Sequence, residues 1–501
     1  MMRESTNPPR KAETDRRRWV ALVVLCAGFL MIVLDQTIVN VALPSIQSDL
    51  HFSQSSLAWV INAYLIAFGG LLLAFGRLGD LIGRRRIFLA GLVVFTLASL
   101  ACGIADSRAL LIGARFVQGV GGAMTSAVIL GMIVTMFPEP ADRAKAIGIY
   151  SFVAAAGGAI GLLAGGVLTQ AINWHWIFFV NLPIGVLTGV LATRLLPGDT
   201  GIGLDRGADV LGALLLVGSL MLAVYAIVET SRYGWGSAHT VGFGAVAVGL
   251  LVAFVVRQST AANPLIPLRM FASRTVTVAN LAMVLMVAGI FGMFFLGALY
   301  LQRVLGYDAV EVGLAFLPVA VGIAAVSVRL APRMIMRSGA KATMIAGLVL
   351  VAAGLVVFCR APVNAGYISD LLPVMVPLGI GAGLVFPALT TLAMSGATPE
   401  DSGLASGLVN TTRQVGGALG LSVLATIATT RTGTLSAHGA STAVALTGGY
   451  HLAFTIAAGL VLAAIAIGLV LLRPPRALEP VAKSVALVEA EFEPEYLDQA
   501  A

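Results

Sequence analysis

Long, continuous apolar runs constrain the fold of this chain more than any other feature. Only 11% of its 501 residues are charged and 58% are hydrophobic, which excludes an ordinary soluble domain. A helix of about twenty apolar residues spans a bilayer, whereas membrane β-strands are alternating segments of about ten. The sequence therefore predicts an all-α polytopic membrane protein with fourteen spans, near 19–41, 57–76, 87–105, 109–134, 144–169, 176–195, 208–228, 239–256, 276–301, 309–329, 342–359, 371–394, 403–428 and 450–472.

The basic residues indicate which side of the membrane each loop occupies. An even number of spans puts both termini on one side, and the N-terminal arm 1–18 holds six basic residues. Alternating the loops from this arm places 24 basic residues in cytoplasmic segments and 5 in external loops. Because cytoplasmic loops are enriched in Lys and Arg, we expect both termini in the cytoplasm. The same bias explains the net charge of +7, so we expect a lipid bilayer and no nucleic acid as partner.

Asp35 is the only acidic residue that falls deep inside a predicted span. A carboxylate at the bilayer centre costs roughly 2.5–3.5 kcal/mol, so such residues usually line a polar cavity or an ion path. Arg115, in another span, falls at a similar depth when a rise of about 1.5 Å per residue is applied. Burying the two together costs less than burying either alone. We interpret Asp35 and Arg115 as a proton-coupling pair; the alternative is a static ion pair that joins two helices.

A loop rich in glycine and arginine, GRLGDLIGRRR at 76–86, separates the second and third spans. Its glycines allow a tight turn and close helix approach. Its charges could latch neighbouring helices on the cytoplasmic side, although the arginines alone would suit any cytoplasmic loop. The whole spacing closely resembles the signature loop of the major facilitator superfamily. The residues expected to form this gating loop are Gly76, Asp80, Gly83, Arg84 and Arg85.

Two glycine-rich stretches resemble other motifs of the same superfamily. LLIGARFVQGVGGA, at 110–123, is similar to the fourth-span motif of its proton-coupled members. GGAIGLLAGG, at 157–166, resembles the fifth-span antiporter motif, except that Leu162 stands where proline is usual. Glycines at four-residue intervals also suit ordinary helix packing. The matching glycines of this second stretch are Gly157, Gly161, Gly165 and Gly166.

Two further stretches resemble the fourteen-span drug:proton antiporter branch of the superfamily. They are LDQTIVNVALP at 34–44 and NWHWIFFVNLPIG at 173–185, where His175 replaces the usual arginine. The resemblance implies the major facilitator fold, with two six-helix bundles and two extra central helices, in a bacterial inner membrane. The implied parts are a cytoplasmic basic arm 1–18, an N-terminal bundle 19–195, two inserted helices 208–256, a C-terminal bundle 276–472 and a cytoplasmic acidic tail 473–501.

Polar and pliable side chains inside the spans are candidates for a substrate cavity. Flexible methionines suit a promiscuous apolar pocket, although core or lipid-facing packing is the simpler explanation for any one of them. Arg413 has no acidic partner in its half of the sequence, so it could bind backbone carbonyls, contact a substrate or bridge the halves. The candidates are Gln36, Asn40, Gln118, Met286, Met293 and Arg413.

The resemblance and the deep carboxylate together predict a proton-driven antiporter that exports amphipathic or cationic drugs by alternating access. The alternative is a proton-coupled symporter or facilitator of a small metabolite. The sequence holds no G-x-x-x-x-G-K-[ST] phosphate loop, no H-E-x-x-H metal site and no G-x-S-x-G nucleophile elbow. We therefore expect a non-enzymatic, monomeric transport unit for small molecules, driven by protons, with no cofactor and no metal.

Overall fold

The chain is almost entirely helical in a computed structural model, which describes residues 8–199, 201, 203, 209–262, 264–266, 268–395 and 402–472. Backbone groups in hydrocarbon must be paired within their own segment, which favours helices in so apolar a sequence. The helices are α1 (Pro8–Asp49), α2 (Gln54–Leu57), α3 (Trp59–Ile82), α4 (Arg84–Gly103), α5 (Arg108–Met136), α6 (Pro140–Ala171), α7 (Trp176–Phe179), α8 (Asn181–Leu195), α9 (Val210–Tyr233), α10 (Ala238–Thr260), α11 (Arg274–Arg303), α12 (Ala309–Ala325), α13 (Ala331–Phe358), α14 (Leu372–Met394), α15 (Ser402–Ala437) and α16 (Thr442–Leu471). One 3-10 helix (Leu268–Ala272) and two π-helical turns (Val326–Leu330, Tyr367–Leu371) lie between them.

The helices differ in how clearly each crosses a membrane. Within the described ranges, eleven helical segments are long and apolar enough to do so. One of them, residues 309–358, is 50 residues long and contains both α12 and α13. At about 1.5 Å per residue it measures about 75 Å, more than twice the hydrocarbon thickness of about 30 Å. Gly339 interrupts it with a φ of 81°. The total of fourteen crossings stays a prediction.

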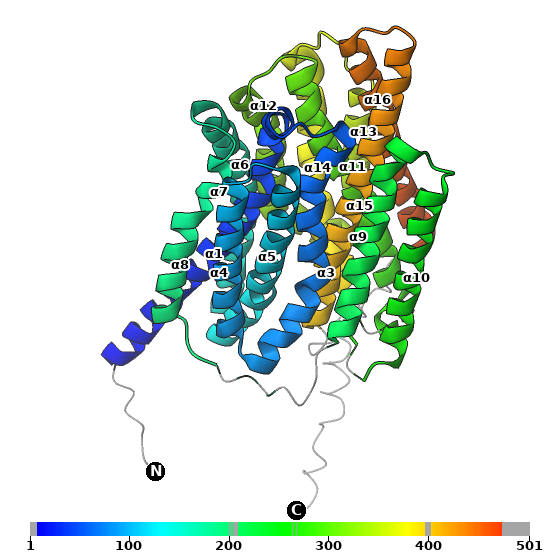
Figure 1. Ribbon diagram of the computed structural model, residues 1–501. Helices are drawn as coiled ribbons and strands as arrows, with labels where there is room; N and C mark the ends of the chain where they lie inside the picture. The colour runs from blue at the N-terminus through cyan, green and yellow to red at the C-terminus, as the bar shows by residue number, and fades with distance from the viewer. Residues whose placement is uncertain are drawn as a thin grey trace, which may run out of the picture.

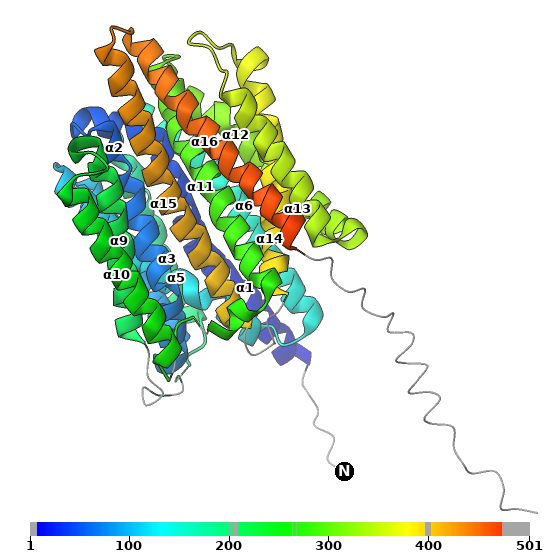
Figure 2. The ribbon, with the colours of Figure 1, turned by 90° about the vertical axis from the view of Figure 1, so that its right-hand side faces the viewer.

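Two groups of helices pack mainly among themselves. In the first group, α1 packs on α6 and α8, and α5 packs on α3 and α4. In the second, α11 packs on α15 and α16, and α14 packs on α12 and α13. The groups meet where α3 packs on α15 and where α6 packs on α12. Helices α9 and α10 form a hairpin beside α3 and α15, as Figures 1 and 2 show from two sides.

The glycines of α6 let it approach α1 closely. A Cβ on Gly161 would lie 2.9 Å from the Leu34 carbonyl oxygen, and one on Gly165 would lie 2.6 Å from that of Ile38. On Gly157 a Cβ would lie 3.0 Å from a methyl carbon of Leu30. A larger residue at the first two positions would displace backbone, so these glycines set the distance between the two helices.

Gly166 brings the two helical groups together. A Cβ at this position would lie 2.6 Å from the Ala309 carbonyl oxygen at the start of α12. Leu162, which stands where the related motif has proline, is buried, and its carbonyl oxygen lies 2.7 Å from where a Cβ of Gly313 would be. The α6 glycine stretch therefore contacts α1 with one part and α12 with another.

Candidate functional site

Asp35 of α1 and Arg115 of α5 form a buried ion pair. Asp35 Oδ2 lies 2.6 Å from Arg115 Nη1, and their side chains are 0% and 2% exposed. The similar depths estimated from the sequence for Asp35 and Arg115 agree with this pairing. A charge left alone in such a place costs several kcal/mol, so each partner lowers the cost of burying the other.

Two amide side chains complete the surroundings of the Asp35 carboxylate. Its Oδ1 accepts hydrogen bonds from Gln118 Nε2 at 2.8 Å and from Asn181 Nδ2, at the start of α8, at 3.0 Å. Both amides also donate to Ser99 Oγ of α4, at 3.1 and 3.0 Å. The carboxylate therefore accepts three hydrogen bonds, one of them from a cation.

Arg115 joins this network to α3. Its Nε donates to the Val60 carbonyl oxygen at 3.0 Å, and its Nη1 donates to Gln118 Oε1 at 2.7 Å. Its guanidinium carbon lies 4.4 Å from the centroid of the Tyr64 ring, in cation–π geometry. The Tyr64 hydroxyl lies 3.5 Å from Gln36 Nε2. Tyr64 thus contacts both the buried cation and a polar residue of α1.

A cavity of about 220 Å³ lies between the two helical groups, beside this network. The first group contributes amide and hydroxyl groups to its wall, and the second contributes aromatic rings. Arg115 is the one charged residue of this wall in the part of the chain that the structure describes. The side chains that give the cavity its amphipathic character are Gln36, Thr37, Asn40, Tyr64, Phe291 and Phe294.

The methionines expected in the cavity are buried elsewhere. Met286 and Met293 are 0% and 1% exposed, and neither lines the cavity. At about 3.6 residues per turn, positions seven apart share one face of α11, while 291 and 294 point to another. The prediction is corrected accordingly: α11 presents Phe291 and Phe294 to the cavity and packs its methionines into the core.

The other predicted cavity residues divide between three places. Gln36 and Asn40 line the cavity. Gln118 lies behind it, on the Asp35 carboxylate. Arg413 of α15 forms no ion pair with any carboxylate that the structure describes, and it does not line the cavity.

The loop predicted to act in gating is held from two sides. Arg84 forms a 2.9 Å ion pair with Asp80 and donates to the Gly131 carbonyl oxygen of α5 at 2.9 Å. The backbone N–H groups of Arg84 and Arg85 donate to the two carboxylate oxygens of Asp199, at 2.6 and 3.2 Å. Asp199 therefore caps the N-terminus of α4, where a negative charge also complements the helix dipole.

The absence of a side chain at Gly83 explains why the loop can lie so close to Asp199. Gly83 has a φ of 108°, and a Cβ there would lie 2.8 Å from the Asp199 carbonyl oxygen. Arg85 also donates to the Thr193 carbonyl oxygen near the end of α8. Gly76, in contrast, makes only ordinary contacts, 3.9 Å from Ala127. Gly83 is the glycine that the close approach requires.

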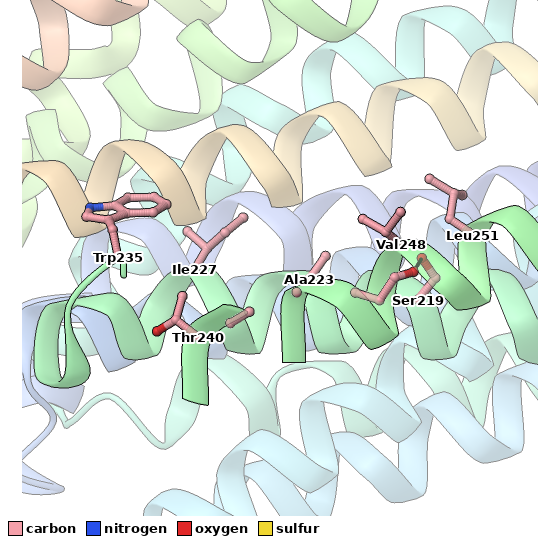
Figure 3. A pocket seen from close by; sticks show the side chains of 10 residues that line it. Ser219, Ala223, Ile227, Trp235, Thr240, Val248 and Leu251 are labelled. Atoms are coloured by element: carbon pink, nitrogen blue, oxygen red, sulfur yellow. Dashed lines mark hydrogen bonds between the residues drawn. The ribbon is translucent and has the colours of Figure 1, made fainter. Parts of the chain in front are cut away.

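A second hollow, of about 260 Å³, lies between α9 and α10 (Figure 3). Its wall is nearly all apolar, with Trp235 at one end. The polar side chains in the wall are already paired: Ser219 donates to the Ala247 carbonyl oxygen at 2.9 Å, and Thr240 donates to that of Gly234 at 3.0 Å. This groove offers packing surface, whereas the central cavity lies beside a charge pair.

Sequence reasoning missed several residues of the Asp35 site. Asn181, Ser99 and Tyr64 are buried polar side chains inside apolar helices. A polar residue in such a helix is itself a signal, since it needs a partner. Asp199 carried no such signal, because an acid in a loop is ordinary.

A buried ion pair beside an amphipathic cavity, between two groups of long apolar helices, defines a membrane transporter. The sequence model of the Major Facilitator Superfamily matches residues 25–421, and the chain belongs to this family. It is accordingly a transport protein and not an enzyme.

Curated relatives of this chain are resistance and export proteins. The puromycin resistance protein pur8 of Streptomyces alboniger is 41% identical over 455 residues, covering 89% of this chain and 90% of the relative. The cephamycin export protein CmcT of Amycolatopsis lactamdurans is 42% identical over 415 residues, covering 81% and 84%.

A solved structure has the same fold. It is a bacterial homologue of the human lysosomal transporter Spinster, in an inward-facing and unoccupied conformation. The TM-score is 0.64 at 17% identity, over 90% of this chain and 96% of that one. At this identity the likeness shows the fold alone.

Proposed function

We propose that this protein is a proton-driven antiporter that exports amphipathic or cationic drugs by alternating access. In this proposal it crosses a bacterial inner membrane fourteen times, with both termini in the cytoplasm, and works as a monomer. It needs no cofactor, because the proton gradient supplies the energy. The single observation that carries the proposal is the buried Asp35 carboxylate beside a cavity between the halves.

The surroundings of Asp35 supply a mechanism for proton coupling. With the carboxylate ionised, Arg115, Gln118 and Asn181 all donate to it. Protonation removes the charge that Arg115 neutralises and weakens this set of hydrogen bonds. Arg115 and its Tyr64 contact are then free to rearrange, and both residues line the cavity. Proton binding and cavity shape are coupled through these two side chains.

The cavity and the relatives support an amphipathic substrate. Aromatic rings such as Phe291 and Phe294 suit the apolar part of a drug, and Gln36 and Asn40 can hydrogen-bond its polar groups. Drug-sized ligands usually occupy about 300–1,000 Å³. At about 220 Å³ the cavity must widen to accept one, as alternating access requires. The resistance and export roles named for the relatives are in keeping with such cargo.

Reconstitution in liposomes with an imposed pH gradient tests the proposal, with ethidium as the transported cation. One proton exchanged for one monovalent cation sustains about a tenfold gradient per pH unit, since each unit is about 1.4 kcal/mol. We expect the wild type to reach such a gradient and Asp35→Asn to lose it while still binding ethidium.

Asp49→Asn is a matched control on the same helix. Asp49 is half exposed and accepts a hydrogen bond from Trp174 Nε1 at 2.9 Å, which an asparagine oxygen can also accept. This variant should transport like the wild type. Undiminished pH-driven export by Asp35→Asn would refute proton coupling through that residue.

A further inference from the structure

Asn181 differs from the other two donors to Asp35 in having a buried hydrogen-bond acceptor with no partner. The residue is 0% exposed, and both hydrogen bonds that the structure gives it are made by Nδ2, to Asp35 and to Ser99. Its Oδ1 is buried without a partner. A buried, unsatisfied polar atom costs about 1–3 kcal/mol, so its presence at this site calls for a physical reason.

The other groups around Asp35 cannot accept a hydrogen bond from its protonated form. Arg115 has donors only. Gln118 Oε1 already accepts from Arg115 Nη1 at 2.7 Å and from Cys102 Sγ at 3.5 Å, which occupies both of its lone pairs. Ser99 Oγ donates to the Phe178 carbonyl oxygen at 2.9 Å and accepts from both amides. A protonated Asp35 becomes a donor, and in the arrangement described none of these three offers it an acceptor.

We propose that Asn181 is the positioning residue that holds the protonated form of Asp35, through a rotation of its side-chain amide by about 180°. The rotation exchanges the places of Oδ1 and Nδ2. The amide oxygen then lies about 3 Å from Asp35 Oδ1 and accepts a hydrogen bond from the protonated carboxyl group. Nδ2 then occupies the place where Oδ1 now lies without a partner. The rotated amide loses its donor bond to Ser99 Oγ, so the rotation is favoured only when Asp35 carries the proton. This inference rests on the proposed proton role of Asp35.

The remaining titratable and charged groups near Asp35 come from three helices. They are Tyr64 of α3, Cys102 of α4 and Arg115 of α5. Cys102 Sγ is paired with Gln118 Oε1 at 3.5 Å, and Tyr64 with Gln36. Asn181 is the contribution of α8, and it does not titrate. It can therefore respond to the proton without competing for it.

Infrared difference spectroscopy between neutral and acidic pH, on purified protein, reads the amide directly. The wild type should lose a band of a free side-chain amide carbonyl and gain one of a hydrogen-bonded carbonyl. Asn181→Leu, of similar size, and Asn181→Ser should both lack this pair of bands. Asn280→Leu is the control: Asn280 is another buried asparagine with an unpaired Oδ1, but its Nδ2 bonds to the Val276 carbonyl oxygen of its own helix.

Ethidium-induced proton release separates switching from mere support of the fold. A serine hydroxyl can donate or accept, so Asn181→Ser should keep the wild-type pH midpoint within about half a unit. Asn181→Asp should raise the midpoint by about one unit or more, because a like charge disfavours ionised Asp35.

The outcomes distinguish a failure of the proposed role of Asn181 from a failure of the proposed antiport function. Proton release that survives in Asp35→Asn would overturn the proposed function. Release lost in Asp35→Asn, together with an unchanged spectrum and midpoint in Asn181→Leu, would overturn the role of Asn181 alone. Amide bands that persist in Asn181→Ser would do the same.

Discussion

The two helical groups differ in the polar groups that they bury, although both also bury aromatic rings. The first buries an ion pair and two amides between α1, α4, α5 and α8, centred on Asp35 and Arg115. The second buries aromatic rings between α11, α13 and α16. Phe358 stacks on Phe454 with centroids 4.3 Å apart and meets the Tyr300 ring edge-on at 5.7 Å.

This difference divides the tasks of transport between the groups. A buried polar network can rearrange its hydrogen bonds when one proton is added or removed, so it can switch. Packed aromatic rings gain from close contact in one arrangement only and resist deformation. We therefore expect the first group to respond to protons and the second to serve as a rigid partner.

Arg115→Gln should cause the largest loss of transport, because it disrupts the polar interior of the first group. The change leaves Asp35 buried without a cation, and breaking one side of a buried pair costs about 3–5 kcal/mol. Asp35 is then expected to stay protonated near neutral pH, and pH-driven ethidium export should fall at least a hundredfold. Arg108→Lys on the same helix is the control, because Arg108 lies near the helix start and binds the Leu50 carbonyl oxygen at 2.9 Å. Transport retained by Arg115→Gln would show that the polar core is only structural.

Phe358→Ala should affect stability and leave proton coupling intact. Removing a fully buried phenylalanine costs about 3–5 kcal/mol in free energy of unfolding, because a cavity remains. Thermal unfolding in detergent should show a clear loss, and Phe358→Leu a smaller one. The pH midpoint of ethidium-induced proton release should not move. A moved midpoint would mean that the second group also takes part in proton binding.

Gly166→Ala should act at the seam between the groups. The added methyl would meet the Ala309 carbonyl oxygen at 2.6 Å and push α6 away from α12. Because this contact joins the halves at the predicted external end, we expect the variant to favour the state that is open outside. A cysteine-labelling assay from the external side, with export measured in parallel, should show greater access and severalfold slower export.

Gly189→Ala on α8 is the control, since a Cβ there has no neighbour within 4 Å and the residue does not line the cavity. It should label and transport like the wild type. Equal effects of the two substitutions would show that the glycines matter for helix flexibility and not for the seam.

The sequence predicted the two charged residues of the site, because a buried charge needs a partner of opposite charge. Asp35 and Arg115 each carry a charge too costly to bury alone, so their depths were enough to match them. Asn181 and Ser99 carry no charge, and only the packing of α4 and α8 against α1 brings them to the carboxylate. Long apolar runs likewise predicted the helices, while the pairing of those helices depends on contacts far apart in sequence.

The wrong predictions have a common physical cause. Met286 and Met293 were judged by their chemistry, but their position on the helix decides which way they face. The spacing of residues along a helix does not show which face lines a cavity and which packs into the core until the neighbouring helices are known. Asp199 went unnoticed because its role depends on the Gly83 backbone, which no side-chain pattern records.

Asp308→Ala should have the smallest effect, again at the seam. Asp308 caps α12 by accepting from the Glu311 backbone N–H at 2.8 Å, and it accepts from Gln170 of α6 at 2.9 Å. Loss of such a cap costs about 1 kcal/mol. We expect a slightly lower midpoint of thermal unfolding at pH 7 and unchanged proton release.

The same residue makes this small contribution sensitive to acid. The hydrogen bond from the Glu311 backbone N–H lowers the pKa of Asp308 below its ordinary value. A group with a lowered pKa contributes its stability above the pKa of the unfolded chain, near 3.9, and loses it as the pH falls through the folded value. The difference in unfolding midpoint between wild type and Asp308→Ala should therefore be full at pH 6 and shrink toward pH 3. A difference that persists at pH 3 would mean that the cap and the Gln170 hydrogen bond do not require the carboxylate charge.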